Sequence, residues 1–220
     1  MKAWVESSSR SRSSGGVATL EVAGQTTQGR DMHIVRMKGP GYTVGGKRLF
    51  LTFNLHAREW ITGMAGVYAV EHLVEKVKAD REYLAGTEVV IMPMANPDGF
   101  LYSTTTDRMH RKNMRNISSS SCVGVDLNRN FDAHWAQGGS SNNPCADTYH
   151  GPSAMSEVES NVIAGVMKEA PMSVYIDVHS LTIASSARGA DQAAVAGAGV
   201  CVQLRAVWRC HHLFARTQRQ

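Results

Sequence analysis

This 220-residue sequence lacks the features that mark several large classes of protein. No apolar run is long enough to cross a lipid bilayer, and no internal repeat is visible. The 23 basic and 19 acidic residues are scattered, with a net charge of +4, so a nucleic-acid partner is not indicated. The opening residues Met1–Ser7 carry a charge but no apolar core follows them, so we identify no signal peptide in this chain.

Glutamate is absent after Ser180. Residues 181–220 contain nine alanines, five arginines and one acidic residue, Asp191. Because this composition departs sharply from the preceding block, we interpret residues 181–220 as an unrelated Ala/Arg-rich tail.

The rest of the chain predicts one α/β unit with a substantial core, since 43% of the residues are hydrophobic. Strand-like apolar runs alternate with stretches of helical periodicity. The strands are expected near 48–55, 88–94 and 173–178, and the helices near 60–78 and 156–170. This alternation predicts a mixed, largely parallel sheet flanked by helices.

Two local patterns predict where elements begin and end. Ser156 followed by Glu159 is a capping-box pattern, which predicts the start of the second helix. Asn-Pro-Asp-Gly at 96–99 is most simply a turn that closes the preceding strand.

A histidine and a glutamate stand three residues apart where the first predicted strand gives way to a helix. These are His56 and Glu59, and His179 ends the last predicted strand. Sites in open α/β sheets gather at the carboxyl ends of strands, so the three side chains are expected to converge. Two histidines and one glutamate leave a fourth zinc position for water, as in hydrolytic sites. The spacing alone also suits a surface histidine beside a solvated glutamate.

Five blocks of sequence, taken in order, resemble the zinc carboxypeptidases of the pancreatic A/B type. The blocks are His56–Trp60, Asn96–Phe100, Arg108–Asn113, Cys122–Phe131 and Thr148–Pro152, within a resemblance that runs from about Gly29 to Ser180. The resemblance implies a zinc-dependent exopeptidase that removes C-terminal residues from peptides. It also implies that the C-terminal part of the family fold is missing here.

The resemblance assigns roles around the metal. His56, Glu59 and His179 would hold Zn²⁺. Asp126 would accept the free ring N–H of the first ligand histidine and fix its tautomer.

Further residues would contact the substrate. Arg111 matches the arginine that stabilises the oxyanion, although a basic stretch of this kind is also typical of a solvated face. Asn128 and Arg129 match the pair that grips the terminal carboxylate, although they also suit ordinary turn chemistry. Arg58 matches a further arginine on the substrate side.

The resemblance also bears on the cysteines and the compartment. Cys122 and Cys145 occupy the positions of a family disulfide, which would indicate an oxidising, extracellular setting. From the sequence, two buried free thiols are the alternative.

The general base of the family is a glutamate on a later strand, and no residue of this chain matches it. The family's usual propeptide is missing as well. We therefore expect residues 1–28 to be a poorly defined N-terminal segment and residues 29–180 to be a partial catalytic domain.

Three functions follow as hypotheses. The first is a zinc carboxypeptidase acting on peptide or protein C-termini, with its activity in this form in question because no residue matches the general base. The second is a non-catalytic remnant that binds zinc and peptide C-termini. The third is a zinc-dependent N-acyl amino acid deacylase.

Overall fold

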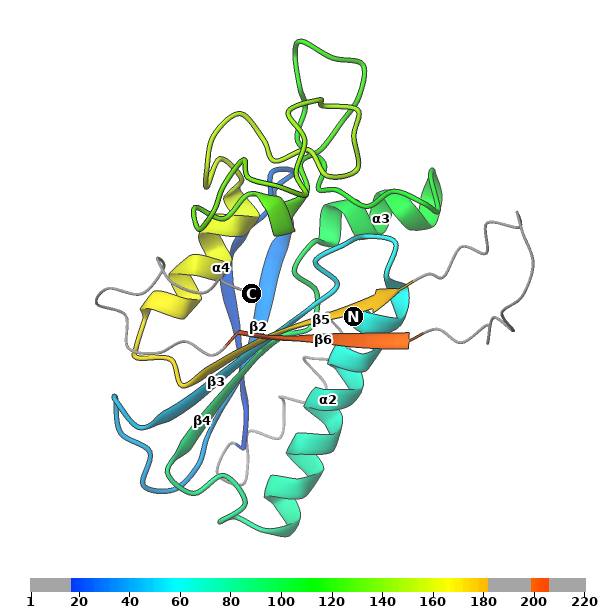
Figure 1. The fold of residues 1–220 in the computed structure, drawn as a ribbon. Helices are drawn as coiled ribbons and strands as arrows, with labels where there is room; N and C mark the ends of the chain where they lie inside the picture. Colours follow the sequence, from blue (N-terminus) through cyan, green and yellow to red (C-terminus); the bar gives the residue numbers. More distant parts are fainter. Residues whose placement is uncertain (1–16, 182–198, 206–220) are drawn as a thin grey trace, which may run out of the picture.

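The computed structural model describes residues 17–181 and 199–205, which form a mixed sheet with helices on both faces (Figure 1). The strands are β1 Thr19–Gln25, β2 Asp31–Lys38, β3 Lys47–Phe53, β4 Thr87–Met92, β5 Val174–Leu181 and β6 Gly199–Arg205. The helices are α2 Trp60–Ala79, α3 Pro97–Thr105, the short 3₁₀ helix η1 Leu127–Arg129 and α4 Val158–Lys168. No helix in the described part of the chain combines the length and the apolar character needed to cross a membrane.

The strands lie in the order β1-β2-β4-β3-β5-β6, which confirms the predicted mixed sheet. The central strand β3 runs parallel to both β4 and β5, while the β1–β2, β2–β4 and β5–β6 pairs are antiparallel. The three apolar runs of the sequence are β3, β4 and β5. Strand β6 lies within residues 181–220, and it pairs with β5 although that segment was expected to be an unrelated tail.

The two faces of the sheet are covered by different helices because adjacent residues of a strand point to opposite sides. On one face, Val70, Val74 and Val77 of α2 pack against the sheet, in a cluster that includes Phe53 and Val178. On the other face, Ile163 and Val166 of α4 belong to a second cluster that also includes Phe50 and Tyr175. Helix α2 follows its prediction closely.

A glycine sets the distance between α2 and the sheet. A Cβ atom on Gly66 would lie 2.8 Å from Cγ of Phe53 and 2.9 Å from Cα of Pro93, which is too close for any side chain. The small residue therefore allows the helix to lie directly on β3.

The two predicted local patterns were wrong in their details. Helix α4 has Glu157 rather than Ser156 at its N-cap and no side-chain cap. The Glu159 carboxylate accepts hydrogen bonds from Thr27 and Asn113. Asn96 caps a helix rather than closing a turn: its Oδ1 accepts the N–H of Gly99, and Pro97 begins α3. Asparagine and proline favour both structures, so the pattern was ambiguous.

A buried charge network joins β3, β4 and α4. Arg48 of β3 is fully buried, and its Nε donates to Oε2 of Glu88 at 2.5 Å, directly across the β3–β4 pair. Its remaining nitrogens donate to the carbonyl of Val166 at 2.9 Å and to the carboxylate of Glu169 at 2.7 Å. Glu88 is also contacted by Arg36 of β2 at 3.2 Å.

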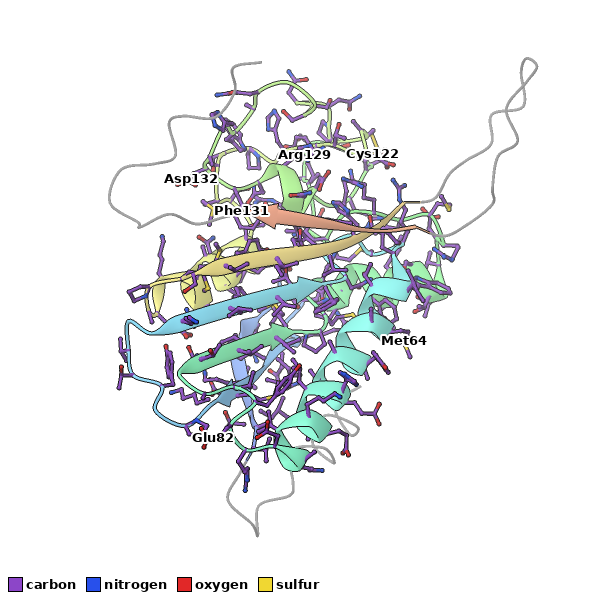
Figure 2. The ribbon with its side chains drawn as sticks, turned by 60° about the horizontal axis from the view of Figure 1, so that its bottom comes forward. Met64, Glu82, Cys122, Arg129, Phe131 and Asp132 are labelled. Carbon is purple, nitrogen blue, oxygen red and sulfur yellow. A yellow bond between two sulfur atoms is a disulfide. The ribbon has the colours of Figure 1, made fainter. Side chains whose placement is uncertain are left out.

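The long connection between α3 and α4 forms a loop-rich region at one end of the molecule (Figure 1). Cys122 and Cys145 form a disulfide within it, with their Cα atoms 5.2 Å apart, so the predicted pairing is present. Figure 2 shows Cys122 and Arg129 in this region, beyond the edge of the sheet formed by β5 and β6. The disulfide closes the loop that carries Asp126, Asn128 and Arg129.

Candidate metal centre

The three expected metal ligands come from the connection between β3 and α2 and from β5, the parallel neighbour of β3. His56 lies three residues beyond the end of β3, Glu59 precedes the first residue of α2, and His179 belongs to β5. Phe53 and Val178 are partners in the β3–β5 register, so the end of β3 and the His179 position lie side by side. All three side chains are buried, so bulk water has little access to them.

The turn between β3 and α2 is shaped by Asn54. This residue has a φ of 54°, in the left-handed region that asparagine tolerates better than most residues. Its Nδ2 donates to the carbonyl oxygens of His56 at 3.3 Å and Glu59 at 3.0 Å. One buried amide therefore holds the backbone of both ligands.

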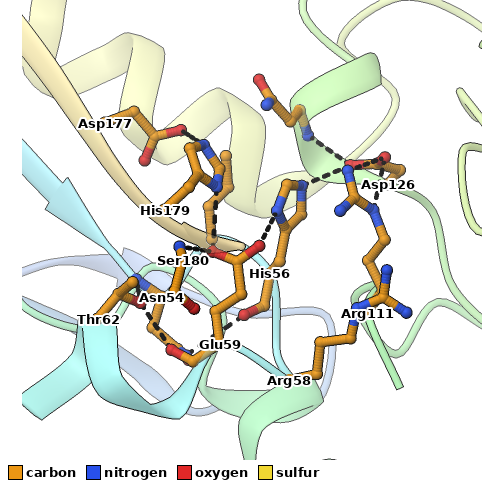
Figure 3. Close-up of polar contacts among 12 residues, drawn as sticks. Asn54, His56, Arg58, Glu59, Thr62, Arg111, Asp126, Asp177, His179 and Ser180 are labelled. Atoms are coloured by element: carbon orange, nitrogen blue, oxygen red, sulfur yellow. Dashed lines mark hydrogen bonds and ion pairs between the residues drawn. The ribbon is translucent and has the colours of Figure 1, made fainter. Parts of the chain in front are cut away.

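The ligand atoms converge on one point (Figure 3). Nδ1 of His56 lies 2.8 Å from Oε1 of Glu59, and Nδ1 of His179 lies 3.3 Å from Oε2 of the same carboxylate. One ligand atom from each of the three residues lies within 4.8 Å of the others. Zinc–nitrogen bonds of about 2.0 Å place tetrahedral ligand atoms roughly 3.3 Å apart, so this donor set fits zinc.

Each histidine contacts a carboxylate other than Glu59 through the ring nitrogen that faces away from the centre. Nε2 of His56 lies 3.1 Å from Oδ1 of Asp126, and Nε2 of His179 lies 2.7 Å from Oδ2 of Asp177. A carboxylate accepts the N–H of the ring it faces, so each Nδ1 is directed to the shared centre. This carboxylate–histidine pairing is the usual support of a zinc-binding imidazole.

The electrostatics of the site favour charged carboxylates. Burial raises the pKa of Glu59, but hydrogen bonds from His179 and His56 and from the Ser180 N–H outweigh burial and lower it to about 2. Burial lowers the pKa of His179, but Asp177 and Glu59 outweigh burial and raise it to about 10. Burial likewise opposes the charged form of Asp126, yet His56 and Arg111 hold its pKa below the ordinary value.

Arg111 lies beside this centre. Its Nε and Nη2 donate to Oδ2 of Asp126 at 3.1 and 2.9 Å, on the oxygen that does not face His56. The carbonyl of Arg111 also accepts the N–H of Ala57, between the two local ligands. Arg111 is thus joined to the His56 segment by both side chain and backbone.

The other expected substrate residues lie on the surrounding loops. Nη1 of Arg58 donates to the carboxylate of Asp147 at 2.8 Å and to the carbonyl of Met109 at 3.2 Å. The N–H of Asn128 donates to Oδ1 of Asp126 at 3.0 Å, and Nε of Arg129 donates to the carbonyl of Gly139 at 2.9 Å. Their roles toward a substrate stay predictions.

Two residues of the site were not singled out from the sequence. Asp177 stands two residues before His179, and this spacing on a strand places both side chains on one face. That signal was available in the sequence. Asn54 carried none, because its role depends on a backbone conformation that the local pattern does not reveal.

Comparisons with known proteins agree with this geometry. The sequence profile of the family described as zinc carboxypeptidase matches residues 1–189. Zinc carboxypeptidase A 1 of Drosophila melanogaster is 37% identical over 186 residues, which cover 81% of this chain and 42% of the relative. Carboxypeptidase A2 of Mus musculus is 36% identical over 171 residues, covering 75% of this chain and 40% of the relative.

Solved structures agree as well. The crystal structure of carboxypeptidase A from Helicoverpa armigera matches with a TM-score of 0.67 and 35% identity, covering 75% of this chain and 41% of that chain. Bovine thrombin-activatable fibrinolysis inhibitor, solved with a tick carboxypeptidase inhibitor, matches with a TM-score of 0.72 and 26% identity, covering 82% of this chain and 59% of that chain. The chain therefore spans about two fifths of the length of the curated relatives described above.

Proposed function

Because this chain belongs to the zinc carboxypeptidase family, we propose that it binds Zn²⁺ and serves the removal of C-terminal residues from peptides. His56, Glu59 and His179 are the proposed ligands. The observation that carries the proposal is their geometry: the ligand atoms lie within 4.8 Å of one another, and both imidazoles are backed by carboxylates. Bound zinc would supply Lewis acidity toward a peptide carbonyl and would activate water.

The substrate side of the proposal rests on arginines near the ligands. Arg111 is only partly exposed, and its guanidinium pairs with Asp126, the carboxylate that also contacts the ligand His56. We assign it the stabilisation of negative charge that develops on the carbonyl oxygen. Asn128 and Arg129 are assigned to the terminal carboxylate, for which a planar guanidinium is suited, and Arg58 to a neighbouring part of the peptide.

A second candidate function is zinc and peptide binding without turnover. Within residues 17–181, the three carboxylates of the centre already have partners: Glu59 contacts the two histidines, Asp126 contacts His56 and Arg111, and Asp177 contacts His179. None of them is free to take a proton from water. Catalysis therefore requires a base beyond these three carboxylates, whereas the binding function does not.

One experiment separates the candidates. The purified chain is titrated with Zn²⁺ in competition with a chromophoric chelator, and the zinc-loaded protein is then incubated with an N-blocked dipeptide. Stoichiometric zinc binding with release of the C-terminal amino acid supports the peptidase. Zinc and peptide binding without release supports the binding function, and release of the acyl group supports the deacylase.

Matched variants tie the result to the proposed ligands. His56→Ala should abolish stoichiometric zinc binding, whereas His134→Ala, which changes an exposed histidine in the loop region, should leave it unchanged. Equal zinc binding by the His56→Ala variant would overturn the assignment of the metal site.

We extend the proposal to the organisation and setting of the chain. All the proposed site residues fall within residues 29–180, which we assign to the partial catalytic domain. Strands β1 and β6 lie outside that range and extend its sheet at the two edges. The partner is a peptide or protein C-terminus. The Cys122–Cys145 disulfide supports an extracellular setting, because such bonds persist in oxidising compartments.

A further inference from the structure

Asp177 is a buried carboxylate that contacts His179 of the metal centre and Thr52 of the neighbouring strand. It lies on β5 two residues before His179, and both side chains are buried on the same face of the sheet. Its Oδ2 faces Nε2 of His179 at 2.7 Å (Figure 3). Its Oδ1 accepts a hydrogen bond from Oγ1 of Thr52 at 2.8 Å.

Thr52 anchors this carboxylate on the neighbouring strand. Thr52 and Asp177 are direct partners in the parallel β3–β5 register, and Thr52 is fully buried. Its hydroxyl also lies 2.8 Å from the hydroxyl of Tyr175. The Tyr175–Thr52–Asp177 chain therefore leaves the carboxylate little freedom to rotate away from His179.

The charge of Asp177 has no other evident use. A buried carboxylate is costly unless it is paired, and most others in this fold have an arginine: Asp126 has Arg111, and Glu88 has Arg48. Among the described residues, no arginine or lysine contacts Asp177, and the His179 ring is its only potentially cationic partner. Among the described residues, the negative charge of Asp177 is therefore compensated through the His179 ring, either by the ring itself or by a cation bound to it.

We infer that Asp177 is the positioning residue of His179, the counterpart of Asp126 at His56. Asp177 keeps the ring proton on Nε2 and leaves the Nδ1 lone pair directed at the centre shared with Glu59. This inference rests on the proposed zinc site. A carboxylate in this position also makes the imidazole a stronger donor to a metal, and loss of such a partner typically costs about 10–100-fold in metal affinity.

The test uses the full 220-residue chain and two readouts besides activity. Zinc affinity is measured by chelator competition, and the ligand field is read from the visible absorption of the Co²⁺-substituted protein. In Asp177→Asn the side chain keeps its size, but its amide group can donate to Nε2 and move the ring proton to Nδ1. We expect a loss of about 10–100-fold in zinc affinity and an altered Co²⁺ spectrum.

Two further variants serve as comparisons for that result. Asp126→Asn should weaken zinc binding in the same range, since it acts on the other histidine. Asp132→Asn, which changes an exposed carboxylate, should leave affinity and spectrum unchanged. Circular dichroism of each metal-free variant establishes that the sheet is folded.

If Asp177→Asn does not fold, Thr52 decides the matter. Thr52→Ser keeps the hydroxyl that orients Asp177 and should bind zinc like the parent, whereas Thr52→Val removes it and should bind more weakly. Parent-like zinc affinity and spectrum in Asp177→Asn, or equal affinity in the two Thr52 variants, would overturn the inference and leave the proposed function standing. Failure of the parent chain to bind zinc would overturn both.

Discussion

Replacing Arg48 with methionine should destabilise the fold strongly while leaving the metal ligands in place. Arg48 is fully buried near the amino end of β3, and His56 lies beyond the other end of the strand. Methionine has a similar length and no charge, so it fills much of the same space. The variant therefore tests the charge network rather than the packing.

The magnitude follows from the contacts that are lost. Breaking a buried ion pair by removing one partner costs about 3–5 kcal/mol when the other charge is left alone. Glu88 keeps Arg36 at 3.2 Å, which lowers that cost, and the bond to Glu169 counts for little because that carboxylate is 42% exposed. The Val166 carbonyl loses its arginine donor, so we expect a net loss of about 3 kcal/mol.

The assay is urea unfolding of the metal-free chain, followed by circular dichroism. Glu88→Gln should cost about 3–5 kcal/mol, since it leaves the fully buried Arg48 with only the half-exposed Glu169 as an ionic partner. The double variant should be less destabilised than the sum of the two single variants. A loss below about 1 kcal/mol for Arg48→Met, or strict additivity, would refute the reasoning.

Three other predictions concern pH, the disulfide and the helix–sheet contact. Burial favours the neutral form of Glu88, but hydrogen bonds from Arg48 and Arg36 outweigh burial and hold its pKa below 4.5. Its contribution to stability should be complete above pH 4.5 and lost as the pH falls through the folded-state pKa, so Glu88→Gln should flatten the acid side of the unfolding free energy plotted against pH. Replacing Cys122 and Cys145 with serine removes a cross-link between residues 23 apart in sequence, and it should lower the free energy of unfolding in urea by about 3 kcal/mol. Equal stability of the oxidised parent and the serine variant would contradict this prediction. Gly66→Ala should destabilise the fold by about 1–3 kcal/mol through overpacking against Phe53. Gly165→Ala in α4, where a Cβ meets nothing within 4 Å, should be neutral or stabilising by up to about 1 kcal/mol. A higher thermal midpoint for Gly66→Ala than for Gly165→Ala would contradict this prediction.

The centre of the sheet could be predicted because each of its three strands contains a short apolar run. β3, β4 and β5 are covered on both faces, so consecutive apolar residues occur in each: Leu49–Leu51, Val89–Met92 and Val174–Ile176. Strand β1 carried no such signal, because its residues alternate irregularly between exposed and half-buried positions. Strand β6 was missed because it lies in a segment whose composition resembles a tail.

The capping-box prediction was wrong: Glu159 makes tertiary contacts in place of the local one. Glu159 has the spacing of a capping box after Ser156, yet its carboxylate reaches Thr27 and Asn113 across the molecule. No pattern within α4 reveals those partners, because they are 132 and 46 residues away in sequence.

The metal centre was predictable in part. The spacing of His56 and Glu59 and the strand-end position of His179 predict a metal site, and resemblance to a family added Asp126. Asp177 shows the same kind of signal, a carboxylate and a histidine on one face of a strand. It was overlooked because its partner Thr52 becomes its neighbour only when β3 and β5 pair.

The pairing of β3 with β5 has a consequence for the order of folding. His56 and Glu59 are neighbours in sequence, but His179 follows Glu59 by 120 residues and reaches it only when the two strands are side by side. In an unfolded chain, therefore, only two of the three proposed ligands, His56 and Glu59, are close together. Binding of the ion at full affinity therefore indicates that β3 and β5 have paired. A chain in which these strands have not yet paired would lose the ion to a chelator that binds it more tightly.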